Sequence, residues 1–307
     1  MKIVTLTLNP AFDVHCTVEN FAPYHENLAK INSRDAGGKG VNISRALTVN
    51  GVENLCFAVL GEENGEDFAR ALERDGMTLC SLTVPGRIRE NITIHTPGAD
   101  ETRISFTGFS TDERLLAEVA ERVDSLVAAG DAVTFTGRVP SGLPMPAVKD
   151  FLRRLREKGA RIVIDSRSFS LADLVELKPW LIKPNQEEIS EYLGREIESF
   201  EEVRAAASEL YEKGIENVMI SLGSKGALLV CKEGFFVAEP PAIEALSTIG
   251  AGDSSIGGFL AAAREGAPAR ERLRRAVAYG SAACMTEGTR PPKAEDVAAL
   301  LARITVK

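Results

Sequence analysis

Short apolar runs rich in β-branched residues alternate with amphipathic stretches along most of the chain. Residues 3–8, 54–60 and 132–136 have the near-continuous apolar character of strands that are buried on both faces. Residues 42–49 and 66–74 instead show helical spacing, and a glycine follows each of them within two positions. This alternation predicts a mostly parallel β-sheet that helices cover on both faces.

The same alternation continues to the C-terminus. Further strands are expected at residues 161–165, 180–183 and 217–222. Further helices are expected at residues 115–127, 146–158, 201–213, 254–264, 270–285 and 294–304. The sequence Ser110-Thr111-Asp112-Glu113 predicts a capping box at the start of the first of these helices. No repeat or linker interrupts the pattern, so we expect a single α/β domain over residues 1–307.

Two segments break this alternation. Residues 91–96 and 102–106, joined by Pro97-Gly98-Ala99-Asp100, have the alternating polarity of a β-hairpin. Residues 14–21 and 29–35 predict a second pair of strands. We expect the insertions at about 12–36 and 88–108 to form a small β-sheet that acts as a lid over the edge of a site. The sequence does not show whether the two pairs of strands meet.

Composition narrows the class of protein. The chain is 44% hydrophobic and 26% charged, as globular proteins are, and its formal net charge of −8 argues against a nucleic-acid partner. The N-terminus lacks the features of a signal peptide, and no apolar run approaches the length of a membrane span. The five cysteines are scattered, without a C-x-x-C pair. We therefore expect a cytoplasmic protein without a membrane partner.

The most informative segment is Ser247-Thr248-Ile249-Gly250-Ala251-Gly252-Asp253-Ser254, which precedes an apolar run. A glycine turn that opens a helix presents free backbone N–H groups to a phosphate. An aspartate in that turn suggests a base that takes a proton from a hydroxyl as it attacks the phosphate. In the alternative interpretation, Gly250 and Gly252 only make a turn and Asp253 caps the helix.

Two segments near the N-terminus are candidates for ligand binding. Ala36-Gly37-Gly38-Lys39-Gly40-Val41-Asn42 places glycines around a lysine that offers a positive charge to a phosphate. It is not a Walker A loop, because Gly40 follows the lysine, and it could be a plain helix-start turn. Asp13, after the first strand, could accept hydrogen bonds from sugar hydroxyls or be an ordinary turn residue.

Two further segments lie in the second half of the chain. In Lys183-Pro184-Asn185-Gln186-Glu187-Glu188, the spacing of Asn185 and Glu188 suits Mg²⁺ or its waters, although an ordinary helix cap has the same pattern. Ser221-Leu222-Gly223-Ser224-Lys225-Gly226-Ala227 is either a strand–turn–strand under a nucleotide or a simple hairpin. The three histidines, His15, His25 and His95, show no metal-ligand spacing, and we interpret them as incidental.

Taken in order, these segments resemble a known family. Its motifs match Leu8-Asn9-Pro10-x-x-Asp13, Gly37-Gly38-Lys39-Gly40-x-Asn42, Lys183-Pro184-Asn185-x-x-Glu188, Ser221-Leu222-Gly223-x-x-Gly226-Ala227 and Gly250-Ala251-Gly252-Asp253. The chain resembles the PfkB (ribokinase-like) carbohydrate kinases over its whole length, in particular the branch of 1-phosphofructokinases and tagatose-6-phosphate kinases. The resemblance implies a doubly wound α/β domain, a small β-lid that often supports a homodimer, ATP, Mg²⁺ and a sugar phosphate. It leaves the need for a monovalent cation open.

The resemblance also implies roles for residues. Asp253 matches the catalytic base, and the turn Gly250, Ala251 and Gly252 matches the anion hole with the Asp253 amide. The residues that match contacts to the acceptor sugar phosphate are Asp13, Gly38, Lys39, Asn42, Arg89 and Asn91. Those that match the nucleotide side are Lys183, Asn185, Glu188, Ser221, Gly223 and Gly226, with Asn185 and Glu188 holding Mg²⁺ through water.

One departure affects the choice of acceptor. Arg138 stands where this branch has a small serine, and it either adds a phosphate contact or crowds the pocket. Fructose 1-phosphate is the first expectation, with conversion to fructose 1,6-bisphosphate. The alternatives are tagatose 6-phosphate as acceptor, a nucleoside or unphosphorylated-sugar kinase, and a non-catalytic sugar-phosphate sensor on the same fold.

Overall fold

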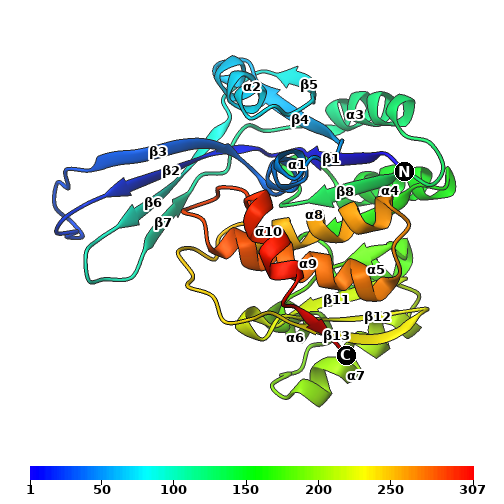
Figure 1. Cartoon of the computed structure of the whole chain (residues 1–307). Coiled ribbons are helices and arrows are strands. Elements are labelled where there is room, and N and C mark those ends of the chain that lie inside the picture. Colours follow the sequence, from blue (N-terminus) through cyan, green and yellow to red (C-terminus); the bar gives the residue numbers. More distant parts are fainter.

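A central β-sheet runs through the computed structural model, which describes all 307 residues (Figure 1). Its strands are β1 (Ile3–Thr7), β4 (Leu55–Gly61), β5 (Leu79–Val84), β8 (Ala132–Thr136), β9 (Arg161–Asp165), β10 (Leu181–Ile182), β11 (Asn217–Ser221), β12 (Ala227–Cys231), β13 (Gly234–Glu239) and β14 (Thr305–Val306). Their order is β14-β13-β12-β11-β10-β9-β8-β1-β4-β5. All neighbours from β11 to β5 are parallel, and β12 to β14 form an antiparallel edge.

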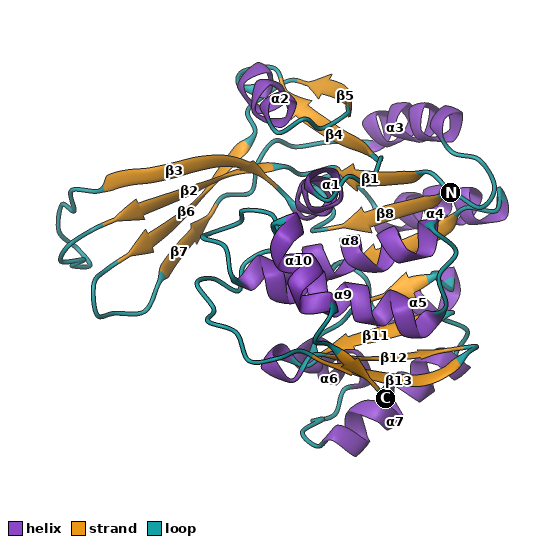
Figure 2. Cartoon of the chain, in the orientation of Figure 1, coloured by secondary structure: helices purple, strands orange, loops and turns teal.

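Helices cover both faces of this sheet (Figure 2). They are α1 (Lys39–Val49), α2 (Gly65–Arg74), α3 (Glu113–Leu126), α4 (Met145–Glu157), α5 (Leu171–Leu177), α6 (Gln186–Leu193), α7 (Phe200–Glu212), α8 (Ala251–Arg264), α9 (Ala269–Cys284) and α10 (Ala294–Leu301). Successive strand residues point to opposite faces. Ile3 accordingly packs in a core with residues of α1, α8, α9 and α10, whereas Val4 packs in the core that α2 to α7 cover. None of the helices combines the length and the hydropathy that crossing a membrane requires.

The order of the strands confirms a doubly wound fold. From β1 the chain moves to β4 and β5 on one side, and it later returns to β8 on the other side and continues outward to β11. Two neighbouring strands, β1 and β8, therefore lead to connections that run in opposite directions. Such a point opens a crevice at the carboxyl ends of the strands, where ligands of open α/β sheets bind.

A second, smaller sheet projects from the main body (Figures 1 and 2). It consists of β2 (Ala11–Thr17), β3 (Lys30–Gly37), β6 (Arg89–His95) and β7 (Thr102–Ser105), in the order β3-β2-β6-β7. The two pairs of strands meet along β2 and β6, which run parallel and place Asp13 beside Asn91. The small sheet expected from the sequence is therefore present, and we call it the lid sheet.

The start of α3 differs from the expectation. Asp112 caps this helix by accepting the Leu115 amide at 3.0 Å, and no reciprocal bond is formed. The predicted capping box is wrong, because the helix begins at Glu113 and a cap at Ser110 would need an earlier start. Reciprocal capping boxes occur instead at the starts of α5, α6 and α7.

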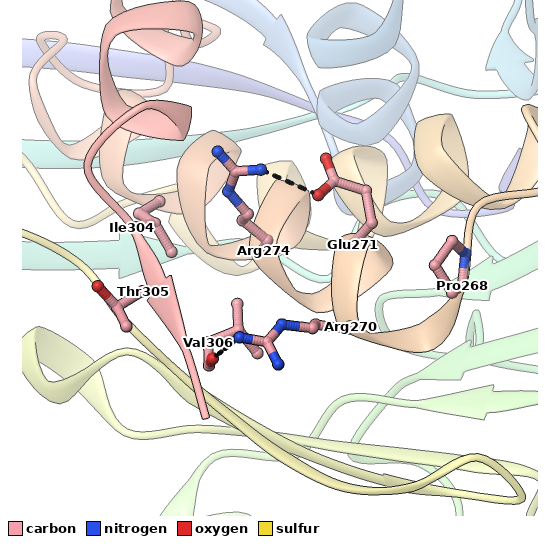
Figure 3. A pocket seen from close by; sticks show the side chains of 7 residues that line it. All are labelled: Pro268, Arg270, Glu271, Arg274, Ile304, Thr305 and Val306. Carbon is pink, nitrogen blue, oxygen red and sulfur yellow. Dashed lines mark hydrogen bonds and ion pairs between the residues drawn. The ribbon is translucent and has the colours of Figure 1, made fainter.

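The C-terminal segment is fastened to the body by two arginines of α9 (Figure 3). Arg270 donates to the Val306 carbonyl, and Arg274 donates to the Leu301 carbonyl. Arg274 also pairs with Glu271 at 3.1 Å. A hollow of about 430 Å³ lies among these residues. Because each guanidinium holds a main-chain carbonyl beyond α9, we interpret this cluster as a structural clasp for α10 and β14.

Candidate active site

A cleft of about 940 Å³ opens at the carboxyl ends of the central strands, between the body and the lid sheet. Segments that follow β1, β8, β9, β10 and β11 contribute to its wall, together with the first turn of α8. Most of its lining residues are polar. The position is the one that the change of direction between β1 and β8 predicts for a ligand site.

Asp253, in the first turn of α8, lines this cleft. Gly250 caps α8 with a φ of 79°, a conformation that suits glycine, so that the helix starts at Ala251. The Asp253 side chain does not cap the helix: its Oδ2 accepts a hydrogen bond from Asn42 Nδ2 at 2.9 Å. The capping interpretation of Asp253 is therefore wrong. The first-turn amides of Gly252 and Asp253 have no helical carbonyl to pair with and lie at the positive end of the helix dipole.

Two lysines and a buried aspartate lie around Asp253. Lys39 Nζ contacts Asp165 Oδ2 at 2.8 Å, and Lys183 Nζ lies 3.9 Å from Asp165 Oδ1. Burial alone would raise the pKa of Asp165, but the two ammonium groups hold it below its ordinary value. A Cβ on Gly252 would lie 3.0 Å from Lys183 Nζ, so this glycine lets the ammonium approach the start of α8.

The electrostatic environment suits Asp253 to act as a base. Burial raises the pKa of this carboxyl to about 6, with Lys39 opposing the rise and Asp165 adding to it. Its side chain is only 7% exposed. A buried carboxylate with a pKa close to neutral pH can accept a proton from a hydroxyl and release it again afterwards.

Three arginines add positive charge to the wall of the larger cleft. Arg89 of β6, Arg103 of β7 and Arg138, which follows β8, all line it, and none of the three forms an ion pair within the chain. Burial lowers the pKa of Arg89, and the charge of Arg138 lowers it further. Guanidinium groups that line one cleft without an acidic partner attract an anion such as a phosphate.

Between the arginines and Asp253, buried polar atoms lack partners within the chain. They are Thr7 Oγ1, Asn9 Oδ1, Asn42 Oδ1, Asn91 Oδ1, Thr136 Oγ1 and Arg89 Nε. Asp13 lies among them and accepts a bond from Asn91 Nδ2 at 3.0 Å. Buried polar atoms are usually satisfied in native proteins, so such a concentration indicates a bound partner. Amide, hydroxyl and carboxylate oxygens suit the hydroxyl donors of a sugar.

A second cleft of about 670 Å³ adjoins the first and shares Lys183, Asn185, Ser221 and Gly252 with it. Gly223 and Gly226 belong to its wall, and residues of α9 and β12 make its far side largely apolar. A largely apolar cleft that borders a lysine and the start of a helix suits a nucleotide, whose base is apolar and whose phosphates are charged.

Asn185 and Glu188 form a reciprocal cap at the start of α6. The Asn185 side chain accepts the Glu188 amide at 2.7 Å, and Glu188 Oε2 accepts the Asn185 amide at 3.0 Å. Glu188 Oε1 accepts a further bond from Arg167 Nε at 3.0 Å. The ordinary capping interpretation is thus correct, yet both residues also line the cleft. No group of three or more histidine, cysteine or acidic side chains is arranged to hold a metal by itself.

The structure brings together every site residue named from the sequence. Those in the larger cleft are Asp13, Gly38, Lys39, Asn42, Arg89, Asn91, Arg138, Lys183, Asn185, Glu188, Ser221, Gly250, Gly252 and Asp253. Ala251, Gly223 and Gly226 line the smaller one. Asp165 and Arg103 also line the larger cleft and were not expected there from the sequence. Asp165 had a signal, because it is a charged residue at the end of a buried strand; Arg103 had none.

Comparisons with known proteins agree with this geometry. Residues 7–296 match the model of the pfkB family carbohydrate kinases. The chain is 32% identical over 312 residues to a 1-phosphofructokinase of Escherichia coli (strain K12), covering 100% of this chain and 98% of the relative. It is 34% identical over 309 residues to a 1-phosphofructokinase of Rhodobacter capsulatus, with the same coverage.

Among solved structures, phosphofructokinase-2 from Escherichia coli in complex with substrates and products superposes with a TM-score of 0.93 at 28% identity. The match covers 99% of each chain. Sequence and fold therefore agree over the whole length of the protein. The chain belongs to the pfkB family of carbohydrate kinases, enzymes that transfer a phosphoryl group to a sugar hydroxyl.

Proposed function

We propose that the protein transfers the γ-phosphoryl group of ATP to fructose 1-phosphate and yields fructose 1,6-bisphosphate. The observation that carries this proposal is the lining of the two clefts: Asp253 shares the larger one with Arg89, Arg103 and Arg138, and its neighbour Gly252 also lines the smaller, more apolar one. An acceptor that spans from these arginines to Asp253 needs a phosphate at one end and a free hydroxyl at the other. The relatives named above as 1-phosphofructokinases favour this acceptor over tagatose 6-phosphate.

In the proposed reaction, Asp253 removes the proton from the 6-hydroxyl of the sugar as that oxygen attacks the γ-phosphorus in line. The amides of Gly252 and Asp253 stabilise the negative charge that develops on the transferred group. The ammonium of Lys183, next to Gly252, adds to this stabilisation. Asp253 then passes its proton to solvent when the product leaves.

At the acceptor end, Arg89, Arg103 and Arg138 bind the existing phosphate, and Asp13 and Asn91 bind hydroxyl groups of the sugar. This positioning holds the hydroxyl next to Asp253, which lowers the entropic part of the barrier. We assign Lys39 to the reacting end, in place of the phosphate anchor expected from the sequence, because its ammonium is bonded to Asp165 beside the base.

Membership of a kinase family implies ATP, and we further propose Mg²⁺ as its counterion. The acidic and amide oxygens of Asn185 and Glu188 fit this ion through water, since Mg²⁺ on a nucleotide keeps several waters and needs few protein ligands. The ion would neutralise negative charge on the triphosphate of ATP. The residues of the protein would orient the nucleotide and the acceptor.

The lid sheet also offers a surface for a second copy of the chain. Tyr24, Leu28, Ile31, Ile104 and Phe106 are large apolar side chains exposed on this sheet or on the loops beside it. We propose a homodimer that buries them while the whole chain acts as one kinase domain. Light scattering after size exclusion should give twice the mass of 33.0 kDa, and a monomer at micromolar concentration would contradict the proposal.

A coupled assay of ADP release with Mg-ATP tests the reaction. Fructose 1-phosphate, tagatose 6-phosphate, fructose 6-phosphate and free fructose are compared, with Asp253→Asn as the inactive control. The highest kcat/KM is expected for fructose 1-phosphate. If another phosphorylated ketose has a higher kcat/KM, that sugar phosphate is the acceptor in place of fructose 1-phosphate. Folded protein that binds ATP and turns over none of them would favour the non-catalytic sensor. Repeating the assay with potassium or sodium alone decides the need for a monovalent cation.

A further inference from the structure

Two histidines that are distant in the sequence meet on the lid sheet. His15 lies on β2 and His95 at the end of β6, and His15 Nδ1 is 3.0 Å from His95 Nε2. On its other side, His95 Nδ1 is 3.1 Å from Glu101 Oε1. Three side chains thus form one hydrogen-bonded row, Glu101–His95–His15. The interpretation of these histidines as incidental did not foresee this contact.

The carboxylate of Glu101 determines which nitrogen donates in each hydrogen bond of the row. Glu101 can only accept, so His95 donates from Nδ1 and, when neutral, accepts at Nε2. His15 must then donate from Nδ1. If His95 carries a proton on each nitrogen, it donates to both neighbours, and His15 accepts at Nδ1. The hydrogen-bonded row therefore exists both when the two imidazoles are neutral and when one of them is protonated.

A second proton is incompatible with the row. With both imidazoles charged, His15 Nδ1 and His95 Nε2 each carry a hydrogen and point it at the other. Two like charges at this distance also repel. His15 is buried, and burial together with the charge of His95 lowers the pKa of His15 below its ordinary value. The contact between the two rings is therefore lost only when both imidazoles carry a hydrogen on their facing nitrogens.

The row lies where the lid sheet meets the body. His15 faces Gly288, where an added Cβ would lie 3.3 Å from His15 Nε2, and both residues line a cavity of about 410 Å³. The next residue, Thr289, lines the acceptor cleft. On β2, His15 is two positions from Asp13 and therefore points to the same face of the lid sheet.

We propose that His15 and His95 are positioning residues, which hold the lid sheet against the loop at Gly288 and thereby keep Asp13 and Asn91 in place for the acceptor. The proposal rests on the proposed function for the identity of the acceptor only. Loss of the row loosens the acceptor end and leaves the nucleotide cleft and Asp253 unchanged. Acceptor binding should therefore weaken as acid adds the second proton.

Other charges around His15 modulate this titration. Asp13 on its own strand, Asp35 on β3 and Glu101 favour the protonated form, and His95 opposes it. Glu287 and Arg290 of the facing loop line the same cavity, and their opposite formal charges cancel. The surrounding carboxylates make the first proton easier to bind, whereas the contact between the rings resists the second.

Three variants test the proposal. His15→Leu fills the space without a hydrogen bond, and we expect KM for fructose 1-phosphate to rise about three- to tenfold at pH 7.5, with kcat and KM for ATP unchanged. His15→Asn keeps a donor at the position of Nδ1 and cannot titrate. It should restore the low KM and remove the additional rise at pH 5.5. His25→Asn, at an exposed lid residue, is the matched control.

Ionisation of the acceptor's phosphate and of Asp253 is common to all variants, so only the difference between wild type and His15→Asn reports the row. Amide hydrogen exchange of β2 and β6 at pH 5.5 and 7.5 needs no acceptor and separates this proposal from the identity of the substrate. Protection factors, which are corrected for the intrinsic pH dependence of amide exchange, should be lower in His15→Leu than in the wild type at pH 7.5. In the wild type they should be lower at pH 5.5 than at pH 7.5. Equal KM and equal exchange in His15→Leu and wild type would overturn it, as would an unchanged pH dependence in His15→Asn.

Discussion

At the scale of single residues, burial of Asp253 opposes folding while it serves the proposed chemistry. In the unfolded chain this carboxyl has its ordinary pKa of 3.8, and in the folded protein the pKa is about 6. Between these values the folded state holds a proton that the unfolded state has lost. Stability from this group therefore falls as pH rises from about 4 through 6, and at pH 7.5 the buried charge destabilises the fold.

Asp253→Asn should lower kcat by about 10²–10⁴-fold, because the base is removed. The same change should raise the free energy of unfolding at pH 7.5 by about 1–3 kcal/mol, since a neutral amide replaces a buried charge. Chemical denaturation at pH 7.5 and pH 4 measures it, and the gain should shrink at the lower pH. A variant less stable than wild type at pH 7.5 would contradict the raised pKa. In the wild type, kcat/KM should fall as pH drops below about 6, because Asp253, with a pKa of about 6, then becomes protonated.

Gly252 provides a second test at this scale. Its backbone is helical, and a methyl group would meet Lys183 Nζ at 3.0 Å. Gly252→Ala should displace the ammonium and lower kcat about tenfold or more, with less than 1 kcal/mol lost in stability. Gly257→Ala in the same helix meets neighbours only at 3.5 Å and beyond, so its kcat should be normal. Equal kcat values for the two variants would remove Lys183 from the proposed mechanism.

Some residue positions could be predicted from the sequence and others could not. Asp253, Asn42 and Asn185 belong to local motifs, whose glycines and spacing are visible in the chain. Arg103 and the pair His15–His95 belong to no motif, because the parallel pairing of β2 with β6 creates their surroundings. A residue that acts within its own turn can be predicted from the local sequence. A residue that acts across paired strands can be identified only from the tertiary structure.

At the scale of elements, α6 and α7 allow the two roles of Asn185 to be separated. Both helices start with a reciprocal cap, Asn185 with Glu188 and Ser199 with Glu202, but only the first lies in the cleft. Asn185→Ala and Ser199→Ala should each cost about 1 kcal/mol of stability. Only Asn185→Ala should also raise the Mg²⁺ concentration needed for half-maximal rate. If both variants keep the wild-type Mg²⁺ dependence, Asn185 is a cap and nothing more.

Most elements were predictable because their apolar periodicity is strong. β8 and β9 have the expected bounds, whereas α1 begins at Lys39 and α8 at Ala251, three residues earlier than the pattern indicates. In both helices glycines occupy the first turns, and glycine carries no apolar signal. The short strand β14 was not foreseen either, since its pairing with β13 depends on the clasp described above.

At the scale of the molecule, that clasp joins the end of the chain to its body. Arg274→Met removes bonds to the Leu301 carbonyl and to Glu271, and it should lower the free energy of unfolding by about 1–3 kcal/mol. Faster amide exchange in β14 should accompany the loss. Since Arg274 lines neither cleft, kcat at 25 °C should stay unchanged. Arg303→Met, at an exposed neighbouring arginine, is the control; equal exchange in both variants would contradict the clasp.

The architecture as a whole followed from the alternation of strands and helices, and the resemblance added that the sheet is doubly wound. The meeting of the two pairs of lid strands did not follow. Hydrophobic patterning fixes which face of a strand is buried but not which distant strand lies beside it. The polar inner face of the lid sheet, with Asp13, His15 and Asn91, has no apolar pattern that could specify such a partner.

The parallel pairing of β2 with β6 also affects the order in which the protein folds. The bond between Asn91 and Asp13 closes a separation of 78 residues, and that between Asn42 and Asp253 closes 211. Contacts of such sequence separation form late, because chain entropy is lost before they return any stability. During synthesis, α8 emerges after the acceptor-binding segments. A nascent chain that has not yet reached α8 therefore holds the proposed acceptor-binding segments without Asp253, and it cannot yet transfer a phosphoryl group.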